Sequence, residues 1–293
     1  MVRIGRLPQL GSALVAAAAL LAPTAHAADG YQYVAMGDSA AAGPLIPNQD
    51  PNLLCFRSEM NYPQVVAARL GAELVDVTCS GARIDDFSGR QHGILPPQYE
   101  ALSRSTDLVT VTIGGNDVRL VQAAVSCLNL LPEPVGRSCA DRFTEGGRDE
   151  LAERIDALVP KVDGMLAEIR DRAPNAQVVV VGYGTYLRPG GCYPLQPLWA
   201  RDADYVQSSV DALSALLRER AAVHGAEFVD LGPVSRGHDV CAAPQDKYFE
   251  GVIPTSEAAP LHPNARGMAA FGQVVADHVA GSRAISPNHR NSH

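Results

Sequence analysis

The chain has 293 residues, of which 46% are hydrophobic and 19% charged, so it can bury a full core and is neither a disordered nor a fibrous protein. Its formal net charge is −8 at pH 7 and its lysines and arginines form no cluster, which argues against a nucleic-acid partner. We expect one globular domain.

The first 27 residues have the pattern of a secretory signal peptide. Arg3 and Arg6 form a positive start, residues 10–22 form an apolar core too short to span a bilayer, and Ala-His-Ala at 25–27 is a cleavage site. A retained membrane anchor is the alternative, and Pro23 directly after the apolar run disfavours it. We expect cleavage after Ala27, a domain over 28–281, a disordered tail over 282–293 and no stable membrane span. The predicted location is secreted, extracellular or associated with the cell wall.

Six cysteines lie after the predicted signal: Cys55, Cys79, Cys127, Cys139, Cys192 and Cys241. An even number of cysteines in an oxidising compartment favours three disulfides, and the absence of a CxxC spacing disfavours a metal site. Six cysteines allow 15 pairings. We expect pairing in chain order: Cys55–Cys79, Cys127–Cys139 and Cys192–Cys241.

Strands that end in polar turns alternate with helices in the first part of the chain. Residues 31–37 form a strand that runs into Ser39, and an amphipathic helix over 59–70 ends before Gly71. Residues 74–78 form a strand leading into Cys-Ser-Gly at 79–81, and the strand over 107–113 stops at Gly-Gly-Asn-Asp over 114–117.

The second part continues the alternation. The expected elements are helices over 118–128 and 145–172, the latter interrupted at Pro160, a strand over 177–181, a long irregular loop over 185–202, a helix over 204–224, a strand over 227–231 and a helix over 264–279. Five strands alternating with helices predict an α/β fold of three layers, with a mostly parallel sheet between helices. Ligands bind beyond the carboxyl ends of the strands in such folds.

Ser39 is the candidate nucleophile, because it is presented where the first strand ends. A serine needs a base, commonly histidine, and its oxyanion needs hydrogen-bond donors. Three histidines lie outside the signal, the tail and the expected helices: His92, His238 and His262. His262 stands in a loop that ends at a helix start, and His238, in Gly-His-Asp, is its competitor. Spacing alone does not separate these two.

Gly81 and Asn116 are the candidate oxyanion donors, through a main-chain N–H and a side-chain amide. Each alone is more often a turn glycine or a helix cap, and their placement after successive strands is what favours the functional interpretation. We expect Asp38 to hold the turn before Ser39. Asp85 and Asp86 are expected to be a helix cap and a solvated face. Trp199 is expected either to wall an acyl pocket or to cover the core.

The blocks Gly37-Asp38-Ser39, Gly81, Gly114 to Asp117 and His262-Pro263-Asn264 together resemble the SGNH (GDSL-type) esterase and lipase family, and most closely its secreted, disulfide-containing actinobacterial type. The resemblance spans nearly the whole mature chain. It implies a flavodoxin-like fold, Ser39 as nucleophile, and His262 rather than His238 as base. The implied oxyanion hole consists of the N–H groups of Ser39 and Gly81 and the side chain of Asn116.

One block departs from the family pattern. The family's usual last block is Asp-x-x-His, and here Ala259 stands three residues before His262. In some similar members a main-chain carbonyl takes the role of the carboxylate. We therefore expect the Ala259 carbonyl to accept from His262 Nδ1–H, which makes a Ser-His dyad, with Glu257 as the substitute.

The expected function is a secreted serine esterase or lipase that forms an acyl-enzyme on Ser39 and needs no metal or other cofactor. Its substrate would be a small-molecule or lipid ester, and the chain would be a monomer. The alternatives are a phospholipase, a polysaccharide deacetylase of the acetyl-xylan type, and a disulfide-stabilised binding domain with a decayed site. The first strand lacks the Gly-x-Ser-x-Gly turn of α/β-hydrolases, because Ala41 stands at its last glycine.

Overall fold

Five parallel strands form one sheet in the order β2-β1-β3-β4-β5 in the computed structural model, which describes residues 1–2 and 30–285. The strands are β1 (Tyr31–Gly37), β2 (Ala72–Asp76), β3 (Leu108–Thr112), β4 (Gln177–Val181) and β5 (Glu227–Val229). The order reverses beside β1, which is the topology of flavodoxin-like folds. The expected α/β fold is confirmed, and the crevice for a ligand lies beyond the carboxyl ends of β1 and β3.

The composition of each strand matches its place in the sheet. β3 is buried at every residue and β4 at every residue but its first, as expected for central parallel strands that are covered on both faces. β2 lies at the edge, and alternate residues along it are exposed.

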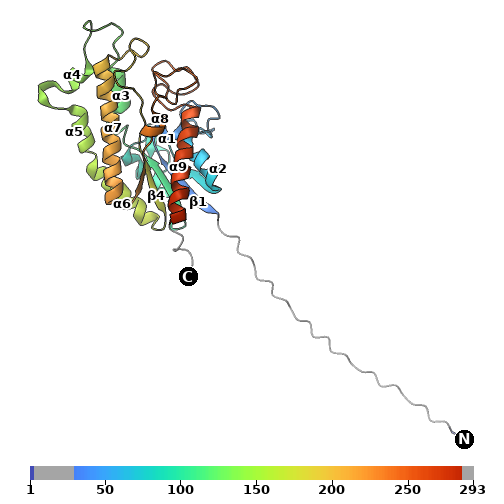
Figure 1. Ribbon diagram of the computed structural model, residues 1–293. Helices are drawn as coiled ribbons and strands as arrows, with labels where there is room; N and C mark the ends of the chain where they lie inside the picture. The colour runs from blue at the N-terminus through green and yellow to red at the C-terminus, as the bar shows by residue number, and fades with distance from the viewer. Residues whose placement is uncertain (3–29, 286–293) are drawn as a thin grey trace.

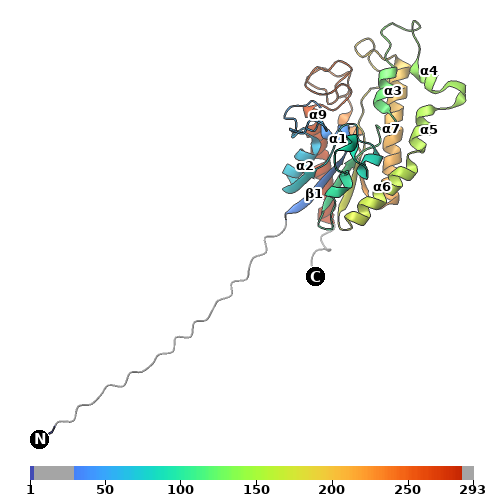
Figure 2. The same cartoon turned by 180° about the vertical axis from the view of Figure 1, so that it is seen from behind.

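Helices cover both faces of the sheet (Figures 1 and 2). The helices are α1 (Ser39–Ala42), α2 (Tyr62–Leu70), α3 (Leu120–Ser126), α4 (Cys139–Phe143), α5 (Glu150–Asp156), α6 (Val159–Arg172), α7 (Ala200–Val223), α8 (Gly232–Ser235) and α9 (Ala265–Ile285). Short 3₁₀ helices span Ile84–Phe87, Gln91–Gly93, Gln98–Ala101 and Glu145–Gly147. α2 packs against α9 on one face, and α5 and α6 pack against α7 on the other.

Alternate residues of β1, β3 and β4 belong to two separate hydrophobic cores. Met36 of β1 and Val111 of β3 join the cluster that includes residues of α6 and α7, whereas Tyr33 and Ala35 join the one that includes α2 and α9. The two-residue period of the strands therefore fixes which layer each side chain supports.

Several element boundaries differ from those expected. α2 begins at Tyr62 rather than 59, because the Asn61 side chain caps it by accepting from the N–H of Gln64 at 3.2 Å. α7 begins at Ala200, so the irregular loop expected over 185–202 ends at 199. The interruption at Pro160 is confirmed, since this proline lies in the first turn of α6.

The carboxyl end of the chain also differs from the expected tail. α9 continues to Ile285, so residues 282–285 are helical. The rest of that tail, and nearly all of the expected signal peptide, lie outside the described residues. In the part of the chain that the structure describes, no helix is both long and apolar enough to cross a bilayer.

The three disulfides expected in chain order are confirmed. Cys55–Cys79 ties the loop after α1 to the turn after β2, Cys127–Cys139 closes the loop between α3 and α4, and Cys192–Cys241 joins the loops that follow β4 and α8. None of the six cysteines lies in a strand, and Cys139 is the first residue of α4. Each disulfide closes a loop of the chain and so restricts the conformations of the unfolded state.

Candidate active site

Ser39 is the first residue of α1, directly beyond the carboxyl end of β1. Gly37 ends the strand at a φ of 144°, and a Cβ there would lie 2.3 Å from the carbonyl oxygen of Thr112, so only glycine fits. Asp38 then caps α1, because its side chain accepts from the N–H of Ala40 at 2.9 Å. This confirms the expected turn-holding role of Asp38, and it leaves the serine half-buried at the end of the sheet.

The imidazole of His262 lies against Ser39. Its Nε2 atom is 2.7 Å from Ser39 Oγ, and its Nδ1 atom is 2.8 Å from the carbonyl oxygen of Pro260. Because a carbonyl can only accept, Nδ1 carries the proton and the lone pair of Nε2 faces the serine hydroxyl. Burial lowers the pKa of His262 below its ordinary 6.5, which favours the neutral imidazole.

The carbonyl that orients the histidine is that of Pro260, so the expectation of Ala259 is wrong. The Ala259 carbonyl accepts the main-chain N–H of His262 at 3.2 Å and closes a four-residue turn. Leu261, the third residue of this turn, has a φ of 61°, and a proline in second place with a positive φ in third place is the type II pattern. Its central peptide is turned so that the Pro260 oxygen reaches the imidazole.

Glu257 does not take the orienting role, since none of the hydrogen bonds among the described residues joins its side chain to His262. The carboxylate that organises this loop is Glu250, which is fully buried. It accepts from the N–H and the hydroxyl of Thr255 at 2.7 and 2.9 Å, from the hydroxyl of Ser256, and from the amide of Asn264 at 2.8 Å. Burial raises the pKa of Glu250, but these hydrogen bonds outweigh it and the net shift is downward.

The main chain of Glu250 also pairs with the residues of the turn. Its N–H donates to the carbonyl of His262 at 3.0 Å, and its carbonyl accepts from the N–H of Leu261 at 3.2 Å. Glu250 therefore holds both ends of the segment that carries the imidazole. The sequence offered no signal for this role, because Glu250 stands 12 residues before His262 in an irregular stretch.

Asn116 lies in the same cavity as Ser39 and His262, whereas Gly81 does not line it. The Asn116 amide donates to the carbonyl of Ala82 at 3.0 Å, which uses one of its two hydrogens. Gly81 has a φ of 81° in the turn after β2. Among the described residues, no acceptor is recorded for the Gly81 N–H.

Tyr183 connects the two turns beside the site. Its hydroxyl donates to Asp38 Oδ2 at 2.7 Å and accepts the N–H of Gly115 at 2.9 Å. Burial raises the pKa of Asp38 to about 7, although the hydrogen bonds from Tyr183 and Ala40 act to lower it. Tyr183 was missed at the level of sequence, since it stands 145 residues from Asp38.

The other acidic residues singled out in the sequence support the neighbouring turns. Asp86 caps the 3₁₀ helix at Ile84–Phe87 by accepting from the N–H of Arg83 at 2.9 Å, and the exposed Asp85 pairs with Lys161 at 2.6 Å. Both observations match their expected roles as cap and solvated face. Asp117 accepts from the N–H of Ile84, and burial raises its pKa to about 6.

His238 and Trp199 lie away from the serine. Nδ1 of His238 is 2.6 Å from the Asp246 carbonyl, and its ring stacks on Tyr248 with centroids 4.0 Å apart. Trp199 is buried, donates to the Leu131 carbonyl at 3.0 Å and lines a separate polar pocket. Two roles were expected for Trp199, and the structure supports covering of the core, because Trp199 does not line the cavity beside Ser39.

A cavity of about 800 Å³, including its open mouth, leads away from Ser39. Ser39, Asn116 and His262 stand at one part of its wall, with Tyr183, Tyr186 and Gln196 as further polar groups. The rest of the wall is largely aliphatic and comes from α3, α7 and the loops: Leu120, Val121, Ala124, Leu187, Leu198, Val206, Val210, Val240, Val252 and Leu261. The cavity suits an apolar chain attached to a group held at Ser39.

No metal site was found in the part of the chain that the structure describes. Within residues 1–2 and 30–285, no group of three or more histidine, cysteine, aspartate or glutamate side chains could hold an ion.

The sequence model of the GDSL-like lipase/acylhydrolase family matches residues 35–270. Lipase 2 of Streptomyces coelicolor is 38% identical over 279 residues, which cover 89% of this chain and 93% of that protein, and a lipase of Streptomyces rimosus is 33% identical over 78% of each chain.

Two crystal structures share the fold with a TM-score of 0.71, and each match covers 85% of this chain and 99% of the other. One is a phospholipase A1 from Streptomyces albidoflavus NA297, at 27% identity, and the other is an extracellular lipase from Streptomyces rimosus, at 29%. This chain belongs to the GDSL-like lipase/acylhydrolase family, the SGNH family that its motifs resemble, and it is a carboxylic-ester hydrolase.

Proposed function

We propose that this enzyme hydrolyses lipid esters through an acyl-enzyme on Ser39, with His262 as general base. The observation that carries the proposal is the 2.7 Å contact between His262 Nε2 and Ser39 Oγ, made while Nδ1 is held by the Pro260 carbonyl. This geometry puts the basic nitrogen within hydrogen-bond reach of the proton it must take.

The reaction has two halves. His262 Nε2 takes the Ser39 proton while Oγ attacks the ester carbonyl carbon, and the resulting imidazolium gives that proton to the departing alcohol. In the second half, water loses a proton to Nε2 and attacks the acyl carbon. Cleavage of the bond to Oγ then releases the carboxylic acid and returns the proton to Ser39.

The oxyanion would be held by the N–H groups of Ser39 and Gly81 and by the amide of Asn116. Asn116 is supported by its place in the cavity and by the amide hydrogen that its bond to Ala82 does not use. Gly81 follows β2, the neighbour of β1 in the sheet, and its N–H has no recorded acceptor among the described residues. Removing one such donor typically lowers kcat by about 10²–10³.

The aliphatic cavity favours an acyl chain of medium or greater length over an acetyl group. An acetyl group ends two carbons from the serine and would leave most of the wall uncovered, which disfavours the polysaccharide deacetylase. A phospholipid is a second candidate substrate, because it presents the same kind of acyl chain and one similar fold is that of a phospholipase A1.

We also propose that the enzyme is secreted and acts as a monomer. The three disulfides support an oxidising compartment, and the similar lipase of Streptomyces rimosus is described as extracellular.

The test is a series of p-nitrophenyl esters from acetyl to palmitoyl, with acetylated xylan beside them, given to the parent enzyme and to Ser39→Ala. We expect kcat/KM to rise from acetyl towards the longer chains and the variant to lose about 10³-fold or more in kcat. A Ser39→Ala enzyme with the parent rate would overturn the proposal. Preference for acetylated xylan would favour the deacetylase instead.

A further inference from the structure

Large apolar side chains stand exposed on loops at one end of the molecule. Apart from the first two residues, the three most exposed among the described residues are Leu130, Ile253 and Leu195, at 84%, 81% and 64%, and Leu131 is 56% exposed. We call these four side chains the apolar tips. They come from the loops after α3, after β4 and before α9. These loops lie at the end of the molecule where α7 and α9 begin (Figure 1).

Hydrogen bonds between the three loops bring the apolar tips together. The N–H of Asn129 donates to the carbonyl of Pro197 at 2.7 Å, and the Trp199 indole donates to the carbonyl of Leu131, which joins the first loop to the second. The N–H of Val252 donates to the side chain of Gln196 at 3.0 Å, which places Ile253 beside the loop of Leu195.

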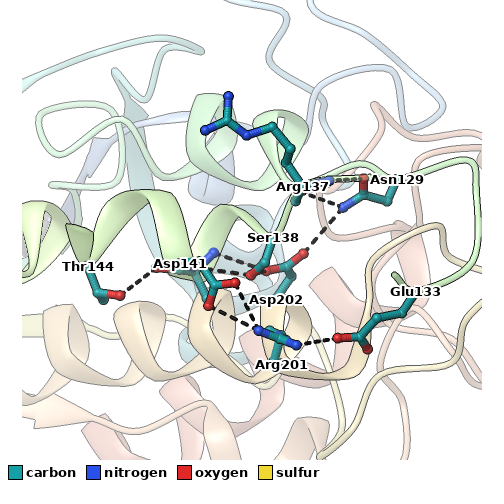
Figure 3. A network of polar contacts seen from close by, with 9 residues as sticks. Asn129, Glu133, Arg137, Ser138, Asp141, Thr144, Arg201 and Asp202 are labelled. Atoms are coloured by element: carbon teal, nitrogen blue, oxygen red, sulfur yellow. Dashed lines mark hydrogen bonds and ion pairs between the residues drawn. The ribbon is translucent and has the colours of Figure 1, made fainter. Parts of the chain in front are cut away.

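A polar network also joins the loop that carries Leu130 and Leu131 to the start of α7 (Figure 3). The fully buried Asp202 accepts from the hydroxyl of Ser138 and from the N–H of Ala140, and Arg201 pairs with both Glu133 and Asp141. These contacts tie the segment that follows the two leucines to the first turn of α7.

The apolar tips stand next to the wall of the active-site cavity. Gln196 and Val252, each adjacent in sequence to a tip, both line that cavity, as does Leu198 of the same loop. An acyl chain leaving an apolar phase that rests on the tips could enter the cavity along apolar side chains, without a step through water.

The charges around the apolar tips restrict the kind of surface that the tips can bind. The segments 128–132, 193–199 and 252–256 contain no lysine, arginine, aspartate or glutamate. The first charge beyond Leu131 is Glu133, which is paired with Arg201. The exposed Arg137, whose N–H and carbonyl bond the side chain of Asn129, is a single cation beside the tips. A surface of anionic headgroups would be met by a cluster of several lysines or arginines, so this face suits a zwitterionic or uncharged lipid surface.

We propose that Leu130, Leu131, Leu195 and Ile253 form a docking surface for a zwitterionic or uncharged lipid surface and deliver acyl chains from it to the cavity. This rests on the proposed function, in which the cavity takes the acyl chain. The side chains insert among the lipids and exchange contact with water for contact with hydrocarbon.

The test measures binding without hydrolysis. The Ser39→Ala protein is sedimented with phosphatidylcholine vesicles and compared with a protein that also carries Leu130→Ser, Leu195→Ser and Ile253→Ser. We expect the three substitutions to lower the partition coefficient at least about tenfold. The matched control is Val223→Ser, which removes a 62% exposed side chain at the far end of α7 and should leave binding unchanged. Replacing part of the lipid with anionic phosphatidylglycerol should not strengthen binding.

A second measurement separates this proposal from the proposed function. The three substitutions in the active enzyme should leave kcat/KM for soluble p-nitrophenyl acetate within about twofold of the parent, since the tips lie outside the site and such surface changes are usually mild. Vesicle binding that survives the three substitutions, or that Ser39→Ala protein lacks altogether, would overturn the docking surface even if hydrolysis proceeds as proposed. Binding that requires anionic lipid would overturn it as well.

Discussion

His262 Nδ1 donates to the carbonyl oxygen of Pro260 at 2.8 Å, and this main-chain contact takes the place of the carboxylate expected from the family's usual Asp-x-x-His block. A carbonyl fixes the tautomer and the ring orientation as a carboxylate does. It brings no full negative charge, so it stabilises the imidazolium less strongly. Burial then dominates, and it lowers the pKa of the histidine.

The pH dependence of kcat/KM follows from that shift. His262 must be neutral to take the serine proton, so activity should rise with pH through a midpoint below its ordinary 6.5 and then level off. The measurement is kcat/KM for a soluble p-nitrophenyl ester between pH 4 and pH 8. A midpoint above pH 7 would indicate a carboxylate partner for the imidazole.

Glu250 should matter for activity although it does not touch the serine. Glu250→Gln puts an amide where four donors converge, which leaves buried hydrogen bonds unmade and should cost about 1–3 kcal/mol of unfolding free energy. We expect kcat to fall by about tenfold or more with little change in KM, because the imidazole is held less well. Urea unfolding and steady-state kinetics provide the two readouts.

Glu257→Gln is the matched control for that variant, since it makes the same chemical change seven residues further along the same loop. We expect kcat within about twofold of the parent enzyme, as for other surface changes. A loss of several orders of magnitude in kcat would mean that Glu257 is the partner of His262 during the reaction.

Asp38 should make stability depend on pH. Its folded-state pKa of about 7 lies above the ordinary 3.8, so the folded protein binds this proton more tightly than the unfolded chain. The resulting stabilisation is complete below about pH 4 and is lost as the pH rises to about 7.

Asp38→Asn removes this dependence, because an amide does not titrate. The unfolding free energy of the variant minus that of the parent should rise between pH 5 and pH 7 by at most about 1.4 kcal/mol per pH unit. Urea melts across this range give that difference. A difference that stays constant with pH would show that Asp38 is already ionised in the folded protein.

The preference of the enzyme for long acyl chains should depend on the width of the cavity. Ala124 of α3 lies on its wall, and Ala124→Phe would fill space opposite α7. We expect kcat/KM for p-nitrophenyl palmitate to fall at least about tenfold, with the acetate ester little changed. Val125→Phe, at the next residue and 50% exposed outside the cavity, is the control. Equal effects of both changes on palmitate would argue that the chain binds elsewhere.

Features that depend on local pattern were predictable from the sequence. The apolar run Val178–Val181 marked a central strand, and Pro160 marked an interruption in the helical segment over 145–172, because both signals act through neighbouring residues. The pairing of Ser39 with His262 required the family resemblance. From spacing alone, His238 was an equal candidate.

Features that depend on tertiary contacts were not predictable. A type II turn favours glycine at its third residue, so a leucine at position 261 does not predict the observed φ of 61°. The contact of its N–H with the Glu250 carbonyl accompanies that conformation, and the conformation in turn aims the Pro260 oxygen at His262. Tyr183 was missed for the same reason, since its role exists only once β4 lies two strands from β1.

The most direct test of the central claim, that His262 activates Ser39 as a nucleophile, is covalent labelling with a fluorophosphonate followed by intact-mass measurement. The parent enzyme should gain the mass of one phosphonyl group on Ser39, His262→Ala should label at least about 10³-fold more slowly, and Ser39→Ala should not label. Labelling of Ser39→Ala at the parent rate, or of His262→Ala as fast as the parent, would contradict the account.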